Sequence, residues 1–385
     1  MLTSSNKPAT FVITGIPEHR ISSQLRNTLA ALTPAGIVLF SRNINDVPEL
    51  LETTSALRGV LGPTALIAVD QEGGRVARLR APFTEWPPMR RFGEANSAAL
   101  ARAAGRAMGR ELAAAGFNCD FAPVLDVDSN PANPVIGDRS FGPRPGVVAR
   151  LGIAFARGLE EAGILPCGKH FPGHGDTDLD SHLALPEVRR TLRQLRRVEL
   201  APFRRAIAAK LPLLMTAHVR YTALDPDLPA TLSKRILRGL LRRELGFRGA
   251  IVSDDLSMHA LDGVGSIGDI AVAAFQAGCD LLLACQSLEA GREAAAALTR
   301  AIRSGRIPES RVVDAQRRVA AIRRWLARRP APRESLDDVL RSGEGARVLE
   351  RLARRLDERT TSTGDARASR APRRPRAAAS RRAPA

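Results

Sequence analysis

The chain is poor in aromatic residues and cysteine, two kinds of residue that often organise a fold. Aromatic residues make up 4% of its 385 positions, so the core must rest mainly on aliphatic side chains. The four cysteines form no CxxC pair, and three lie in or beside apolar runs, where a thiol behaves as a small hydrophobic group. We therefore expect structural thiols rather than a disulfide framework or a zinc site. They are Cys119, Cys167, Cys279 and Cys285.

Long hydrophobic runs are also missing. No segment approaches the roughly 20 apolar residues that are needed to cross a bilayer. The first ten residues are polar, and the apolar run that follows them, Phe11–Ile16, is shorter than the core of a signal peptide. We therefore expect a cytoplasmic protein that has no membrane partner.

Acidic residues are too few to balance the basic ones, and the formal net charge is +18. Residues 366–385 contribute seven arginines and no acidic residue to this excess, and much of the rest is arginine on expected helical faces. Such arginines can simply be solvated, so we do not expect nucleic acid as a partner. A basic surface can still attract an anionic substrate.

Apolar, β-rich runs alternate with helical patterns through residues 1–330, which indicates a parallel sheet covered by helices. Eight such runs over roughly 275 residues predict a single-domain α/β fold, a closed (β/α)8 TIM barrel. An open doubly wound sheet is the alternative, but no glycine-rich dinucleotide fingerprint follows the first run. The expected strands are Phe11–Ile16, Gly36–Phe40, Ala65–Asp70, Cys119–Leu125, Pro166–Phe171, Leu213–Val219, Ala250–Ser253 and Asp280–Cys285. The expected helices are Ala98–Ala115, Val147–Ala162, Arg193–Ala209, Ser233–Leu245, Ile267–Ala277, Leu288–Ser304 and Glu309–Ala327.

The composition changes near residue 331. Residues 331–359 form a charged extension, in which Ser335 is a suitable N-cap for one amphipathic helix that ends at Arg359. Residues 360–385 are rich in Arg, Ala, Pro and Ser and lack apolar periodicity. We expect this basic tail to be disordered, because it cannot bury enough surface to offset its chain entropy.

Polar residues gather at or just after the C-terminal ends of the expected strands, where barrel enzymes place their active sites. Each one alone has an ordinary structural explanation as a cap, a turn residue or a hydrogen-bonded core histidine. Five of the six histidines share this placement, which those separate explanations do not account for. The group contains Asp70, Glu72, Arg75, Arg78, Asp126, Asp128, Lys169, His170, His174, Asp176, Asp180, His182, His218, Asp254, Asp255 and His259.

Two kinds of chemistry fit this group. A metal site is one, but its histidines straddle Pro172, Gly173 and Gly175, so they lie on a loop rather than on a helix that would set the ligand spacing. Carbohydrate chemistry is the other. Glycoside cleavage needs a carboxylate that stabilises an oxocarbenium-like centre and a proton donor for the leaving oxygen. The expected rim offers both.

Four segments of this rim resemble the bacterial β-N-acetylglucosaminidases of glycoside hydrolase family 3. They occur in the family's order, and the resemblance covers roughly residues 10–330. The segment from Lys169 to His182 is long and is the most specific of the four. The segments are DQEGGRV from Asp70, GDRSFG from Gly137, KHFPGHGDT from Lys169 with DSH from Asp180, and SDDLSM from Ser253.

The resemblance implies a retaining hydrolase that forms a covalent glycosyl-enzyme. It makes Asp254 the nucleophile, a choice between Asp254 and Asp255 that periodicity alone leaves open. It also makes His182 the acid/base, oriented by Asp180, in place of the carboxylic acid of most glycosidases. An imidazole can give and take a proton near neutral pH, so this role is chemically reasonable.

Binding roles also follow from the resemblance. Asp70 would hold sugar hydroxyls, and four further side chains would complete the pocket around a terminal, non-reducing N-acetylglucosamine. The arginines and the lysine among them only donate hydrogen bonds, which suits hydroxyl and carbonyl oxygens. The four are Arg78, Arg139, Lys169 and His170.

The resemblance further implies a role in peptidoglycan recycling, without a metal or organic cofactor. The substrate would be N-acetylglucosamine β-1,4-linked to 1,6-anhydro-N-acetylmuramic acid, with or without a peptide. We expect a monomer whose partner is this small carbohydrate. Three alternatives stay open, namely a β-glucosidase, an N-acetylglucosaminide phosphorylase on the same fold, and a non-catalytic sugar-binding barrel.

Overall fold

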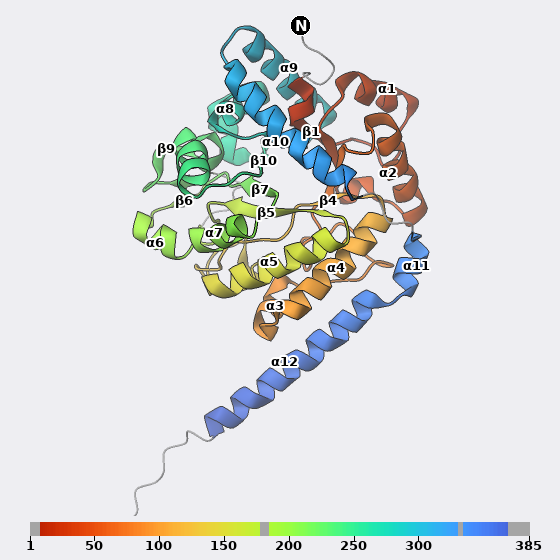
Figure 1. Cartoon of the computed structure of the whole chain (residues 1–385), viewed down its shortest axis with the longest axis vertical. Coiled ribbons are helices and arrows are strands. Elements are labelled where there is room, and N and C mark those ends of the chain that lie inside the picture. The colour runs from red at the N-terminus through yellow and green to blue at the C-terminus, as the bar shows by residue number, and fades with distance from the viewer. Residues whose placement is uncertain (1–7, 178–184, 330–333, 369–385) are drawn as a thin grey trace, which may run out of the picture.

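The computed structural model describes residues 8–177, 185–329 and 334–368. Eight parallel strands close into a barrel in the order β1-β11-β10-β7-β5-β4-β3-β2 (Figure 1). Each of the eight expected strands overlaps one of them, which confirms the predicted (β/α)8 barrel. The strands are β1 (Val12–Thr14), β2 (Gly36–Val38), β3 (Leu66–Val69), β4 (Cys119–Asp120), β5 (Leu165–Phe171), β7 (Leu213–Thr216), β10 (Ala250–Asp255) and β11 (Leu281–Ala284).

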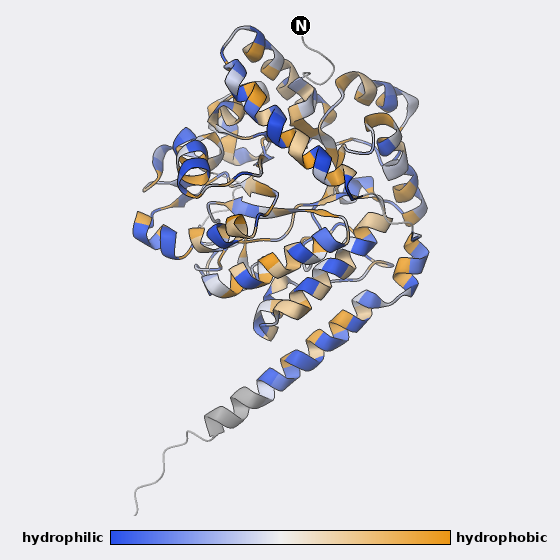
Figure 2. Ribbon diagram, in the orientation of Figure 1, coloured by the Kyte–Doolittle hydropathy of each residue, from blue (hydrophilic) through white to orange (hydrophobic). Residues whose placement is uncertain are grey.

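Helices lie between successive strands and cover the outside of the barrel (Figure 1). They carry both hydrophilic and hydrophobic residues (Figure 2), as expected of helices that bury one side against the barrel. The helices before β2 and β3, and the short α3, were absent from the prediction. The helices are α1 (Ser23–Leu32), α2 (Val47–Leu61), α3 (Met89–Ala95), α4 (Ala98–Ala114), α5 (Pro145–Glu161), α8 (Ile267–Ala277), α9 (Leu288–Arg303), α10 (Glu309–Ala327) and a π-helix at Arg235–Glu244.

The single helix expected at Arg193–Ala209 is wrong. The structure has two helices there, α6 (Leu192–Arg197) and α7 (Leu200–Ala208). Pro202 explains the break, because it has no N–H to donate to the carbonyl of Val198 and its ring would collide with that carbonyl in a continuous helix. Glu199 is therefore placed at the start of α7, where its side chain is buried.

The single helix expected at Ser335–Arg359 is also wrong. Ser335 does cap a helix, and its hydroxyl accepts the N–H of Asp338 at 3.2 Å, but α11 ends at Arg341 (Leu336–Arg341). Gly343 follows with φ of 62°, a left-handed conformation that ends helices. The next helix, α12 (Glu344–Ala368), packs Val348 and Leu352 into the core beside α3 and α4.

The expected disorder of residues 360–385 is wrong for its first part, because α12 runs to Ala368 (Figure 1). Extending a helix that already exists adds backbone hydrogen bonds without a new nucleation step. The hydroxyls of Thr360 and Thr361 also bond back to the carbonyls of Leu356 and Asp357, at 3.0 and 3.1 Å. Residues 369–385 lie outside the described residues.

A small second sheet stands beyond the C-terminal ends of β5 and β7. It consists of β6 (Glu187–Val188), β8 (Arg220–Tyr221) and β9 (Asp225–Pro229), in the order β6-β8-β9. Residues 178–184 lie between β5 and β6 in the sequence. The pairing of β6 with β8 therefore fixes the position of the chain just after them. No helix in the described ranges is long and apolar enough to cross a membrane.

Candidate active site

A cavity of about 520 Å³ lies at the C-terminal ends of the barrel strands. The binding residues expected from the sequence and the expected nucleophile all line it, on side chains that follow β3 and β4 or lie near the C-terminal ends of β5 and β10. They are Asp70, Arg78, Arg139, Lys169, His170 and Asp254. His182 and Asp180, the expected acid/base and its partner, lie outside the described residues.

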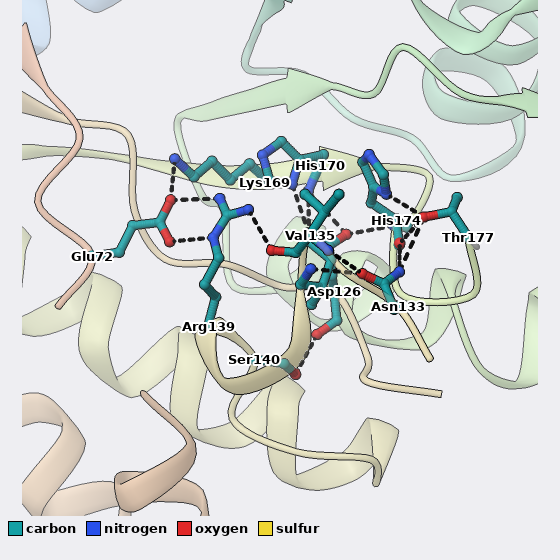
Figure 3. A network of polar contacts seen from close by, with 12 residues as sticks. Glu72, Asp126, Asn133, Val135, Arg139, Ser140, Lys169, His170, His174 and Thr177 are labelled. Carbon is teal, nitrogen blue, oxygen red and sulfur yellow. Dashed lines mark hydrogen bonds and ion pairs between the residues drawn. The ribbon is translucent and has the colours of Figure 1, made fainter. Parts of the chain in front are cut away.

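The wall of the cavity contains a compact network of opposite charges. Lys169 contacts Asp70 at 2.7 Å and Glu72 at 2.6 Å through its Nζ. Arg139 donates Nε and Nη2 to the two oxygens of Glu72, both at 2.8 Å. Figure 3 shows Lys169 and Arg139 converging on this carboxylate. Charge-assisted, two-pronged contacts of this kind fix side chains in both position and direction.

These contacts hold the network in its ionised state. Burial opposes the charge on Glu72, but Arg139 and Lys169 outweigh it and hold the pKa of that carboxyl far below its ordinary value. Burial also opposes the charge on Lys169, but Asp70 and Glu72 hold its pKa above the ordinary value. A sugar entering the cavity therefore meets fixed ionic donors and acceptors rather than groups that must change protonation.

The turn after β3 places Asp70 and Arg78 in the cavity through Gln71. The Gln71 side-chain carbonyl accepts the N–H groups of Arg78 and Leu79 at 2.8 and 3.0 Å. Its own backbone N–H donates to the buried Asp120 at 3.0 Å. The Nε of Arg78 is buried and has no hydrogen-bond partner among the described residues. Arg78 itself lines the cavity, with its Nη2 3.7 Å from Asp70.

His170 is oriented from behind by Asp126. Its Nδ1 lies 2.7 Å from Oδ2 of Asp126, and Oδ1 of the same carboxylate accepts the backbone N–H groups of His170 and His174 (Figure 3). With Nδ1 engaged, Nε2 is the ring nitrogen that remains for a ligand. His174 also lines the cavity, and burial, together with the nearby His170, lowers its pKa to about 4, which keeps it neutral.

Asp254 is the partly exposed carboxylate at the end of β10. One of its oxygens accepts the backbone N–H of Asp255 at 2.9 Å. Burial opposes its ionisation, but the nearby His170 and His218, the Asp255 amide and Lys169 hold the pKa of this carboxyl below its ordinary value. Asp254 is therefore a permanent anion that faces the cavity.

Asp255 has the opposite character. One of its oxygens accepts the backbone N–H groups of Ser257 and Cys285, both at 3.1 Å, so it links the ends of β10 and β11. Burial raises its pKa, and the charge of Asp254 adds to that effect despite the two amides. His218 supports the same strand end, with Nε2 2.9 Å from the Asp255 carbonyl oxygen.

The structure separates the remaining rim residues by position. His259 is exposed and pairs with Asp262 at 2.7 Å, and Asp128 pairs with Arg90. Within the described ranges, no three His, Cys, Asp or Glu side chains are arranged to hold a metal ion. Sequence reasoning gave no role to Glu72. Counting charges could have found it, because two buried cations need more than one buried carboxylate.

Comparisons with known proteins agree with this geometry. The profile of the Glycosyl hydrolase family 3 N terminal domain matches residues 9–322. A beta-hexosaminidase of Neisseria meningitidis serogroup C (strain 053442) is 42% identical over 285 residues, which cover 72% of this chain and 78% of that protein. That of Nitrosomonas eutropha (strain DSM 101675 / C91 / Nm57) is 44% identical over 264 residues, 67% of this chain and 75% of that protein.

Solved structures show the same relationship. A glycoside hydrolase family 3 beta-N-acetylglucosaminidase from Paenibacillus sp. str. FPU-7 superposes with a TM-score of 0.86 at 39% identity, covering 92% of this chain and 69% of that one. NagZ from Neisseria gonorrhoeae, in complex with N-trifluoroacetyl-D-glucosamine, superposes with a TM-score of 0.75 at 34% identity. The match covers 90% of this chain and 97% of that one. The chain therefore belongs to glycosyl hydrolase family 3 and is a glycoside hydrolase of the β-N-acetylhexosaminidase type.

Proposed function

We propose that the protein is a retaining exo-β-N-acetylglucosaminidase with Asp254 as its nucleophile. The observation that carries this proposal is the contrast between two adjacent carboxyls. Both carboxyls border the cavity, but Asp254 has a lowered pKa, whereas Asp255 is tied to two amides and has a raised pKa. When the surroundings of two neighbouring carboxyls shift their pKa values in opposite directions, the two groups are suited to different roles. An anion beside the sugar is what nucleophilic attack requires.

The reaction proceeds in two displacements. Asp254 attacks the anomeric carbon while the bond to the leaving oxygen breaks, and His182, oriented by Asp180, gives its proton to that oxygen. Water then attacks the glycosyl-enzyme, gives its proton back to His182, and releases Asp254. The stereochemistry at the anomeric carbon is inverted twice and therefore retained.

The charged wall of the cavity would grip the terminal sugar. Asp70 accepts hydrogen bonds from its hydroxyls, whereas Lys169 and the guanidinium of Arg78 donate to its oxygens. Arg139 uses three of its N–H groups on Glu72 and the Val135 carbonyl, which leaves two for the ligand. His170 contributes its Nε2. Groups held by buried partners bind without a large loss of side-chain entropy.

The substrate that we propose is N-acetylglucosamine β-1,4-linked to 1,6-anhydro-N-acetylmuramic acid, with or without a peptide, in cytoplasmic peptidoglycan recycling. The support is the resemblance of the rim segments and the relatives named beta-hexosaminidase and NagZ. Product analysis on such a disaccharide-peptide would test it. Release of free N-acetylglucosamine is the expected result, and an intact disaccharide would contradict the assignment.

Activity on aryl glycosides tests the reaction itself. We expect rapid hydrolysis of an aryl β-N-acetylglucosaminide, little hydrolysis of the matching glucoside, and free sugar rather than sugar 1-phosphate in phosphate buffer. Asp254→Asn should reduce kcat by about 10⁴-fold, because the covalent route is lost. Asp338→Asn, which changes an exposed carboxylate that pairs with Arg341 on α11, is the control. Equal activity in both variants would contradict the proposal.

A further inference from the structure

A partly buried ion-pair chain joins the two ends of the segment that carries Asp180 and His182. Asp176 precedes residues 178–184, and Arg190 follows them. The Nη2 of Arg190 lies 2.5 Å from Asp176, and its Nη1 lies 3.1 Å from Glu199 on α7. One guanidinium thus holds the chain on both sides of this segment and ties it to a helix of the barrel wall.

The end at Asp176 is held by the barrel as well. Gly173 has φ of 133°, and a Cβ there would come within 2.7 Å of the Glu199 side chain. A Cβ at Gly175 would lie 1.6 Å from the Val127 carbonyl oxygen, so only glycine fits against that backbone. Tyr221 also donates its hydroxyl to the Gly173 carbonyl at 2.7 Å. Little freedom is left at this end.

The Glu199 carboxylate is the most deeply buried of the three groups in this ion-pair chain. Its side chain is 1% exposed, against 22% for Arg190. One oxygen accepts the Ser129 hydroxyl at 3.3 Å and contacts Arg190, whereas the other has no partner among the described residues. Burial raises the pKa of Glu199 to about 7, although Arg190 opposes that rise. Such a group is expensive to bury, which indicates a role beyond packing.

Glu199 does not line the catalytic cavity, so it is not placed to contact the substrate. We propose that Asp176, Arg190 and Glu199 are positioning residues, and that their ion-pair chain sets the reach of His182 toward the leaving oxygen. This inference rests on the proposed function of His182. It extends that proposal, because the family resemblance gave no role to Asp176, Arg190 or Glu199.

The leaving group provides the test. A poor leaving group, such as a second sugar, needs the proton of His182, whereas an activated phenol departs without it. Misplacing a catalytic group by about 1 Å can reduce a rate by about 10²-fold. We therefore expect Arg190→Met to lower kcat about 10²-fold on a disaccharide, to lower it only slightly on a dinitrophenyl glycoside, and to leave KM nearly unchanged.

The assays should be run at about pH 8, where Glu199 is ionised. Arg189→Met is the matched control, because Arg189 is the neighbouring residue but is exposed and pairs with Glu187 on β6. Arg190→Lys should recover part of the lost disaccharide activity, since it restores the charge without the two-pronged geometry. Asp176→Asn removes the charge at the more exposed end of the ion-pair chain and should show the same selective loss of disaccharide activity.

Turnover of the activated glycoside shows in each variant that the barrel is folded and that Asp254 works. An equal loss on both substrates, or no loss in Arg190→Met, would overturn the inference. His182→Ala separates this failure from that of the proposed function. If His182→Ala shows no leaving-group dependence, the role of His182 fails. If His182→Ala shows leaving-group dependence and the Arg190 and Asp176 variants do not, only the positioning inference fails.

Discussion

Glu72 illustrates, at the scale of the residue, how the neighbours of a carboxylate decide its function. Glu72 compensates two buried cations, and removing one partner of such a network leaves an uncompensated buried charge. We expect Glu72→Gln to lower the free energy of unfolding by about 3 kcal/mol. Chemical denaturation would measure it. Glu94→Gln, at an exposed pair with Arg91, should lower it by less than about 1 kcal/mol. Similar losses in the two variants would contradict the proposed weight of this network.

Glu199 predicts a dependence of stability on pH. Its pKa is about 7 in the folded protein and near 4.5 when unperturbed, so the folded state binds the extra proton between these values. The stability that this proton contributes is fully present below about pH 4.5 and is lost as pH rises through about 7. The change amounts to about 3 kcal/mol.

Glu199→Gln cannot titrate and should lack this component. Measured from pH 5 to pH 8, the unfolding free energy of the native chain should therefore fall relative to that of the variant, because only the native carboxyl ionises over this range. A constant difference between the two over that range would show that Glu199 keeps an ordinary pKa in the folded state.

At the scale of elements, the strands were predictable and the helix boundaries less so. The strands are short apolar runs buried on both faces, and each of them is visible in the sequence. The helix breaks at Pro202 and Gly343 were missed, although both residue types interrupt helices. The far end of α12 was missed for another reason, because composition predicts failure to form a core but does not predict where an established helix stops.

The docking of α12 can be tested by itself. Leu352 is 3% exposed and packs against the barrel helices, so Leu352→Ala should weaken this contact by about 2 to 5 kcal/mol. Hydrogen exchange should increase along α12, while hydrolysis of an aryl glycoside is unchanged. Arg351→Ala, at an exposed position of the same helix, is the control. A parallel loss of activity would show that α12 supports the cavity.

The candidate site was predictable in part. Strand ends located the cavity, and the sequence segments indicated Asp70, Lys169 and Asp254. The sequence could not show that Glu72 binds Arg139 and Lys169 together, since that contact joins three segments that are far apart along the chain. The opposite pKa directions of Asp254 and Asp255 likewise depend on groups from other strands.

At the scale of the whole molecule, the charge of +18 predicts long-range attraction of anionic substrates. We expect kcat/KM for a disaccharide-peptide with free carboxylates to fall several-fold as salt rises from about 0.01 to about 0.15 M, because screening shortens the reach of the field. A neutral aryl glycoside should show little change. Equal salt dependence for the two substrates would show that the surface charge has no part in substrate capture.

Trapping the covalent intermediate tests the central claim, that Asp254 is the nucleophile of a retaining β-N-acetylglucosaminidase, most directly. A 5-fluoro-N-acetylglucosaminyl fluoride forms the glycosyl-enzyme and slows its hydrolysis, so the labelled enzyme can be digested and sequenced by mass spectrometry. The account predicts one N-acetylglucosaminyl adduct on Asp254, absent from Asp254→Asn. An adduct on Asp255, or turnover to an inverted product with no adduct, would contradict it.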